Sequence, residues 1–214
     1  MIRKYFFIAA AVIATTWLAT FLIYPRLPSQ IPLHWNLSGR VDRYGSRENL
    51  FLMPGIMVLV VLLFAALPWL SPRRFEVNAF RSTYLYIMLL VVALIGYLHA
   101  LMVWAALSKP LDMSRSLFGA LFLFLVLIGN VLGKVKRNFY IGVRTPWALA
   151  NEKVWYATHR FAAKVCVIGG LVGLVSLILT PNPVFALVIL ISSALASVVY
   201  SLAYYKRLEG RNEL

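Results

Sequence analysis

Six long apolar stretches, separated by short polar segments, set the pattern of this chain. They cover residues 5–24, 50–70, 84–107, 117–133, 162–180 and 184–205. About 20 apolar residues in a helix cross the roughly 30 Å of hydrocarbon in a bilayer. In lipid every backbone polar group must be satisfied within the protein, which helices achieve and open sheets do not. The pattern therefore predicts an all-α, polytopic membrane protein with six transmembrane helices.

The composition supports a membrane protein. Of 214 residues, 62% are apolar and 13% are charged, whereas soluble domains are about half apolar and a quarter charged. The first apolar stretch follows Arg3 and Lys4 as a signal peptide would, but it is too long for the apolar region of one and lacks a small-residue cleavage site. We expect it to stay attached as the first helix.

Lysine and arginine predict the orientation. If the N-terminus is inside, the cytoplasmic segments 1–4, 71–83, 134–164 and 206–214 hold 15 of the 21 basic residues, and the outer segments 25–49 and 108–116 hold 6. Basic residues accumulate on the cytoplasmic side of membrane proteins. We therefore expect both termini in the cytoplasm of a bacterial-type cell membrane, and the net charge of +14 requires no direct nucleic-acid binding.

The spans divide the chain into two halves. Residues 1–110 form a predicted three-helix part with an extracytoplasmic loop at 25–49, and residues 111–214 form a second with a cytoplasmic loop at 134–161. Glycine pairs spaced four apart, Gly129 with Gly133 and Gly169 with Gly173, predict close packing between membrane helices.

The outer loop contains most of the polar chemistry outside the membrane. Pro25, Pro28 and Pro32 prevent a helix through its first part, while Ser38-Gly39 and Tyr44-Gly45 predict turns. Its candidate binding residues are His34, Trp35, Asn36 and Asp42. Two interpretations stay open: a ligand-binding or catalytic patch, or structural roles. In the structural interpretation, Asp42 pairs with an arginine, Trp35 lies among the headgroups and His34 makes a hydrogen bond within the loop.

The inner loop is dense in aromatic and basic residues. Residues 142–147 predict a turn, and Asn151 is a typical N-cap for a helix that runs into the fifth span. On this helix Trp155 and His159 lie on one face. An interfacial aromatic and basic belt explains part of this composition, and a functional centre is the alternative.

Within the spans, polar residues are few. The strongly polar candidates are His99 and Asn130, and no Asp or Glu lies in any predicted span. His99 either lines a cavity or joins two helices by a hydrogen bond, and a carboxylate-based ion relay has no components. Cys166 is a single cysteine, the three histidines fall in different segments, and no catalytic motif occurs. We therefore expect no metal site, no cofactor and no enzymatic activity.

Two segments resemble a known family. From Leu27 to Arg47 the chain has Leu-Pro-x-x-Ile-Pro-x-His-Trp-Asn and Gly-Arg-x-Asp, which resemble the short domain that precedes SdpI-type domains. A second set of residues resembles the signature of the SdpI family itself: Arg137-Asn138, Gly142, Arg144-Thr-Pro-Trp147, Leu149, Trp155 and Thr158-His159. The resemblance covers roughly residues 10–190. Ala148 replaces a usual threonine, which removes a hydroxyl, and Arg47 replaces a common lysine.

The resemblance implies an immunity protein that protects a bacterium against a secreted, membrane-active peptide toxin. It also implies a receptor role, in which the toxin-bound protein holds a small cytosolic transcriptional repressor at the membrane. The implied binding residues in the inner loop are Asn138, Arg144, Trp147, Trp155 and His159. The alternative is a small permease or transporter of a lipophilic compound. Membrane lipids are the remaining expected partners.

Overall fold

Six long helices account for most of the chain. The computed structural model describes residues 2–70, 77–180 and 182–214. The long helices are α1 (Arg3–Ile23), α2 (Leu52–Leu70), α3 (Arg81–Ala106), α4 (Met113–Leu132), α6 (Glu152–Leu179) and α7 (Pro183–Glu209). Each is long and apolar enough to cross a membrane, which confirms the predicted spans. Pro181, between the fifth and sixth predicted spans, and the basic residues Arg73 and Arg74 lie outside the described residues.

Short elements connect the long helices. They are the 3-10 turns at Tyr24–Arg26, Arg47–Phe51 and Val77–Phe80, the helix α5 (Pro146–Ala150), and the strands β1 (Gln30–Trp35) and β2 (Val41–Ser46). The chain forms two compact units. Unit 1 contains Met1–Ala65 and Leu85–Ala120, and unit 2 contains Ala66–Tyr84 and Leu121–Leu214. The division into halves at residue 110 stays a prediction.

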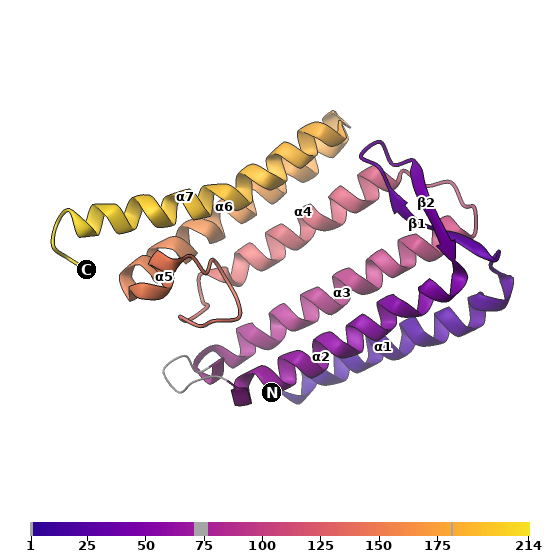
Figure 1. Cartoon of the computed structure of the whole chain (residues 1–214), viewed down its shortest axis with the longest axis horizontal. Coiled ribbons are helices and arrows are strands. Elements are labelled where there is room, and N and C mark those ends of the chain that lie inside the picture. The colour runs from indigo at the N-terminus through magenta and orange to yellow at the C-terminus, as the bar shows by residue number, and fades with distance from the viewer. Residues whose placement is uncertain (1, 71–76, 181) are drawn as a thin grey trace. The chain divides into compact units, whose positions relative to one another are not determined.

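In unit 1, the outer loop is an antiparallel β-hairpin, which the sequence analysis did not predict (Figure 1). The predicted turn at Ser38-Gly39 is confirmed, and Gly39 has a φ of 75°, which favours glycine. The predicted turn at Tyr44-Gly45 is wrong, because both residues lie within β2. Gly45 pairs with Ile31, and a Cβ atom there would overlap the Leu33 side chain. The glycine at 45 thus permits packing across the hairpin.

Two irregularities interrupt the pairing of the strands. Pro32 lies opposite Tyr44 but His34 lies opposite Arg43, so Leu33 is an extra residue in β1. Asp42 is then an extra residue in β2, because the next pair is Trp35 with Val41. Single-residue bulges of this kind bend a strand and increase its twist.

An apolar cluster attaches the hairpin to the helices of unit 1. Its buried members are Leu27, Ile31, Leu50, Met102, Val103 and Ala106. They come from the start of the hairpin, the turn before α2 and the C-terminal part of α3. Burying such side chains stabilises the arrangement by about 25 cal/mol per Å² of apolar surface. The hairpin is therefore a packed part of unit 1.

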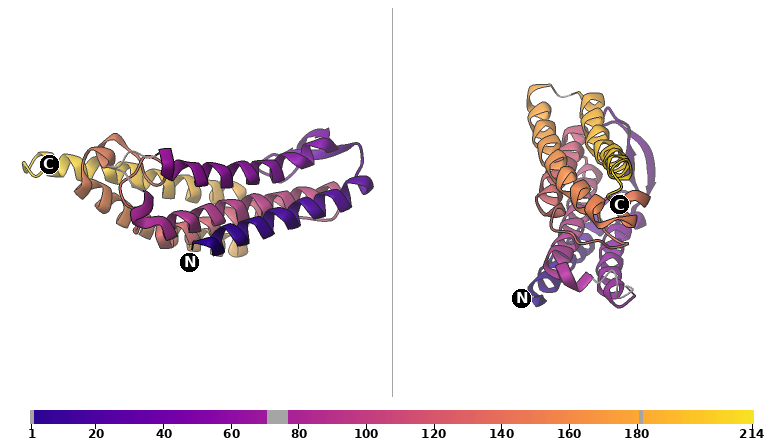
Figure 2. Two further views of the ribbon diagram at one scale, coloured as in Figure 1. Left: turned by 90° about the horizontal axis from the view of Figure 1, so that it is seen from below. Right: turned by 90° about the vertical axis from the view of Figure 1, so that its left-hand side faces the viewer.

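In unit 2, α6 and α7 form an antiparallel pair that lies side by side in every view (Figures 1 and 2). Phe161 stacks on Tyr200 with ring centroids 4.1 Å apart, and Gly169 lies directly against Ser193. The predicted close contact at Gly129 is confirmed, since a Cβ atom there would lie 2.8 Å from Cys166 Cβ. Close approach of this kind supplies the packing that holds membrane helices together.

Large apolar side chains cover the outside of the helices. Phe7, Trp69, Ile178 and Leu179 are each at least 75% exposed. Exposed apolar side chains in such number are costly in water but are solvated by lipid. The exposed surface therefore agrees with multi-pass membrane localisation.

Candidate functional site

The inner loop in unit 2 is organised around a buried histidine. His159 on α6 is fully buried, and its Nε2 accepts a hydrogen bond of 3.1 Å from the backbone N–H of Val143. Its Nδ1 donates to the Trp155 carbonyl at 2.9 Å. This pattern places the single ring proton on Nδ1 and makes the ring neutral. His159 thus joins the loop to α6 and has no free nitrogen for another partner.

Trp155 adds a second connection one turn earlier. Its indole Nε1 donates to the Val135 carbonyl at 2.9 Å, and its ring stacks on His159 at a centroid distance of 4.0 Å. The predicted shared face of Trp155 and His159 is confirmed. Both side chains are fully buried, so this face packs against the loop that follows α4 and is closed to solvent.

Asn138 sets the shape of the loop. Its amide group donates to the carbonyls of Lys136 and Ile141, and its Oδ1 accepts from the N–H groups of Tyr140 and Ile141. The side chain is fully buried. One asparagine therefore satisfies four backbone groups that the irregular chain would otherwise leave unpaired.

The end of the loop is a capped helix. The sequence predicts a turn through 142–147, but Pro146 and Trp147 begin α5, because Thr145 is an N-cap whose hydroxyl accepts from Ala148 N–H. Thr145 also bonds to Ser201 of α7. Ala148 is fully buried, so its methyl group packs inside while its backbone N–H makes the capping bond.

The exposed charged side chains of the inner loop are mainly basic. Arg144 is exposed, and its Nη1 donates to the Phe139 carbonyl at 2.6 Å. Trp147 is half-buried. The other exposed lysines and arginines between residues 134 and 164 are at positions 134, 136, 153, 160 and 164. The loop therefore has a rigid interior of signature residues beneath a basic surface, and Arg144 is its exposed signature residue with a charge to offer.

The hairpin in unit 1 brings together two of the outer candidates, His34 and Asp42. His34 Nδ1 lies 2.5 Å from Asp42 Oδ1, with both side chains about half exposed. The structural interpretation predicted an arginine as the partner of Asp42. That prediction is wrong, because the partner is His34. Asn36 Oδ1 accepts from the Arg40 N–H and so closes the turn. Asp42 is the extra residue of β2, and this bulge sets it beside His34.

The two intramembrane candidates differ. His99 on α3 is buried, and its Nε2 lies 2.9 Å from the Thr20 hydroxyl on α1, so it joins two helices of unit 1. Its Nδ1 has no hydrogen-bond partner among the described residues. Asn130 on α4 is exposed, and nothing in the structure brings it to the other candidates.

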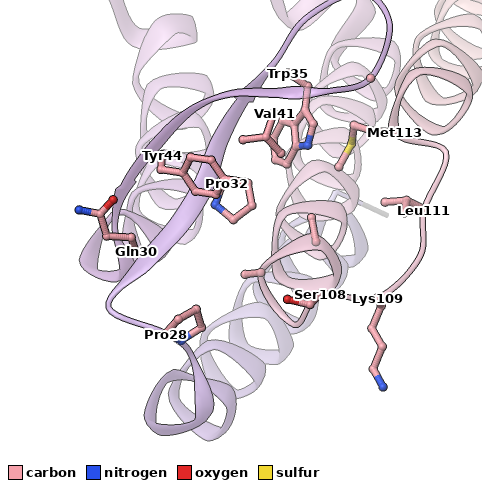
Figure 3. Close-up of a pocket in the computed structure, with 13 residues that line it drawn as sticks. Pro28, Gln30, Pro32, Trp35, Val41, Tyr44, Ser108, Lys109, Leu111 and Met113 are labelled. Carbon is pink, nitrogen blue, oxygen red and sulfur yellow. The ribbon is translucent and has the colours of Figure 1, made fainter.

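A cavity of about 280 Å³ lies between the hairpin and the end of α3 in unit 1 (Figure 3). Its walls include Pro28, Pro32, Trp35 and Tyr44 from the hairpin side. Facing them are Ala105, Ala106, Ser108, Lys109, Leu111 and Met113. Of these residues the sequence analysis singled out only Trp35 as a site residue. Ser108 and Lys109 are polar but lie far from Trp35 in the sequence, and only folding brings segments about 70 residues apart together.

No group of three His, Cys, Asp or Glu residues with the geometry of a metal site occurs within 2–70, 77–180 and 182–214.

Comparison with known proteins identifies relatives of both loops. A domain of unknown function (DUF1648) matches residues 11–58, and the SdpI/YfhL protein family matches residues 134–201. The Immunity protein SdpI of Bacillus subtilis is 28% identical over 206 residues, which cover 95% of this chain and 97% of that protein. An uncharacterized protein of Archaeoglobus fulgidus is 43% identical over 44 residues, or 21% of this chain and 24% of that protein. No solved structure matches the chain.

Proposed function

Because this chain is a membrane protein of the SdpI/YfhL family, we propose that it protects a bacterial cell against a secreted, membrane-active peptide toxin. The observation that carries the proposal is its similarity to an immunity protein along nearly the whole of both chains. That similarity includes the hairpin of unit 1 and the hydrogen-bonded inner loop of unit 2. Protection in this proposal acts by binding, with the hairpin on the outer side.

The second part of the proposal concerns the inner loop. Once toxin is bound, the exposed basic surface of the inner loop holds a small cytosolic transcriptional repressor at the membrane. A rigid interior supports this role, because Asn138, Trp155 and His159 fix the loop by internal hydrogen bonds. Clustered like charges on a fixed surface attract an oppositely charged partner and orient it.

Survival under toxin challenge tests the first part. Sensitive bacteria that express the chain or an empty vector are exposed to a graded panel of purified membrane-active peptide toxins. We expect the chain to raise the tolerated concentration of at least one toxin. Equal survival of both cultures across the panel contradicts the proposal. If the chain also lowers the accumulation of unrelated lipophilic dyes, the result favours a permease over a protein that protects by binding the toxin.

Recruitment of a fluorescent repressor tests the second part. Arg144→Lys keeps the charge but removes the planar guanidinium group, which presents several hydrogen-bond donors. In the unmodified chain one of these donors bonds to the Phe139 carbonyl. We expect Arg144→Lys to reduce toxin-dependent recruitment at unchanged membrane levels. Lys153→Arg, at another exposed basic position of the inner loop, is the matched control and should recruit normally. Equal recruitment by both variants removes Arg144 from the partner surface.

A further inference from the structure

The cavity of unit 1 has room for one or two ring-sized groups. Its volume is about 280 Å³. A protein cavity of about 150 Å³ accommodates benzene, while sites for whole small molecules begin at about 300 Å³. The volume therefore suits a side chain, or a side chain with its adjoining backbone, and is too small for a folded peptide.

The lining combines ring faces with polar groups, and most of its accessible surface is polar. Figure 3 shows Tyr44 beside Pro32 and Trp35 beside Val41, while Lys109 extends away from the cavity. Aromatic and proline rings offer wide contact surfaces to another ring or a branched aliphatic group. Gln30 and Ser108 add an amide and a hydroxyl. Backbone N–H and C=O groups need such partners when they leave water, whereas an acyl chain cannot bond to them. The lining thus favours a peptide over a lipid tail.

The strands themselves are poor templates for an added strand. Each carries an extra residue, Leu33 in β1 and Asp42 in β2, and bulges twist an edge away from regular pairing. Pro32 moreover has no N–H to donate. A peptide is therefore held by a side chain placed into the cavity, rather than by extension of the sheet.

The cavity walls are fixed on both sides. Ser114 Oγ donates to the Leu37 carbonyl at 2.8 Å near the hairpin tip, and Arg47 Nη1 donates to the Leu27 carbonyl at 3.3 Å near its base. On the helix side, Ser108 has a φ of 55°, and Lys109 N–H bonds back to the Trp104 carbonyl, which closes the end of α3. Binding to preformed walls avoids much of the cost of ordering them.

We propose that this cavity is the toxin-recognition pocket, and that it takes an aromatic or large aliphatic side chain from an extended segment of the peptide toxin, with Gln30 and Ser108 bonding to the adjoining backbone. The inference rests on the proposed immunity function. A peptide that enters membranes exposes apolar side chains of this kind. The pocket intercepts one of them at the ends of the membrane helices.

A cavity-filling variant tests the pocket. Ala105→Leu adds bulk to the cavity wall, whereas Ala100→Leu adds the same bulk at an exposed position of α3 that does not line the cavity. The probe is the peptide toxin against which the unmodified chain gives the largest protection. We expect Ala105→Leu to lower the tolerated toxin concentration about tenfold, which corresponds to about 1.4 kcal/mol. Ala100→Leu should protect like the unmodified chain. Membrane level and gel-filtration profile in detergent are measured for each variant.

A second test changes the hairpin instead of α3. Tyr44→Ala removes an exposed ring from the cavity wall, and Leu37→Ala removes an exposed apolar side chain of the same hairpin outside the cavity. We expect Tyr44→Ala to lose protection and Leu37→Ala to keep it. If both Ala105→Leu and Tyr44→Ala protect fully, the pocket is overturned while the immunity function stands. If the unmodified chain protects against no toxin, both fail.

Discussion

At the scale of single residues, the family signature of the inner loop acts largely on the backbone. Asn138 bonds to four backbone groups, and His159 accepts the N–H of Val143 while donating to the Trp155 carbonyl. These contacts explain why such polar residues stand in a sequence that is otherwise apolar. Irregular backbone near a membrane is stable only when its N–H and C=O groups find partners.

Gly142→Ala should remove much of the folded protein. Gly142 has a φ of 107°, and a Cβ atom there would overlap the His159 ring at Nε2. The backbone strain alone costs about 1–3 kcal/mol, and the displaced ring would lose its bond to Val143. Thermal unfolding in detergent measures the effect. Gly55→Ala, which adds its methyl group to open space on α2, should be as stable as the unmodified protein or slightly more stable, because alanine favours a helix. Equal stability of the two variants would contradict the close contact.

Asn138→Asp should be destabilising although the two side chains have nearly the same shape. Aspartate cannot donate to the carbonyls of Lys136 and Ile141, and each buried group left unpaired costs about 1–3 kcal/mol. Asn182→Asp is the control, because the Asn182 side chain accepts from the N–H groups of Val184 and Phe185 and donates to no group among the described residues. Aspartate caps helices as well as asparagine does. Unfolding temperatures that fall equally in both variants would count against the donor role of Asn138.

At the scale of elements, close helix contacts depend on where each glycine faces. The sequence marked Gly129 with Gly133 and Gly169 with Gly173 by their spacing. In the structure Gly129 is tightly packed, whereas at Gly133 an added Cβ atom would make only an ordinary contact of 3.9 Å, with Ala163. Gly170, outside both pairs, would place a Cβ atom 2.7 Å from the Phe122 carbonyl oxygen.

Gly170→Ala should therefore separate α4 from α6, because the obstacle is backbone, which a rotamer change cannot relieve. We expect a lower unfolding temperature in detergent, with a loss of about 1–3 kcal/mol typical of overpacking. Gly133→Ala should be neutral, since Gly133 lies in the turn after α4 and an added Cβ atom would make only an ordinary contact there. The opposite order of stability would show that α4 and α6 do not approach each other at Gly170.

At the scale of the whole molecule, the spans are settled by length and apolarity, while the orientation is a prediction from charge. Single-cysteine labelling tests it in a Cys166→Ala background, since the chain has one cysteine. Ser38→Cys should react with an impermeant reagent in intact cells, and Lys134→Cys only after lysis. Both positions are exposed. The reversed pattern would place the hairpin in the cytoplasm and exchange the proposed partners of the two loops.

The sequence alone determined the features that depend on near neighbours. Apolar runs of sufficient length form helices in lipid because each backbone bond joins residues four apart. For the same reason the N-cap at Asn151 and the shared face of Trp155 and His159 were predictable. The family resemblance was carried by short motifs within the two loops.

Only the tertiary structure decided the features that join distant segments. The hairpin depends on pairing between β1 and β2 and on packing against Met102, Val103 and Ala106, so prolines and glycines alone suggested a loop. Burial of His159 depends on Val143 and on the space left by Gly142. The cavity needs Tyr44 beside the end of α3. Such contacts follow from the packing of whole elements, which the local order of residues does not encode by itself.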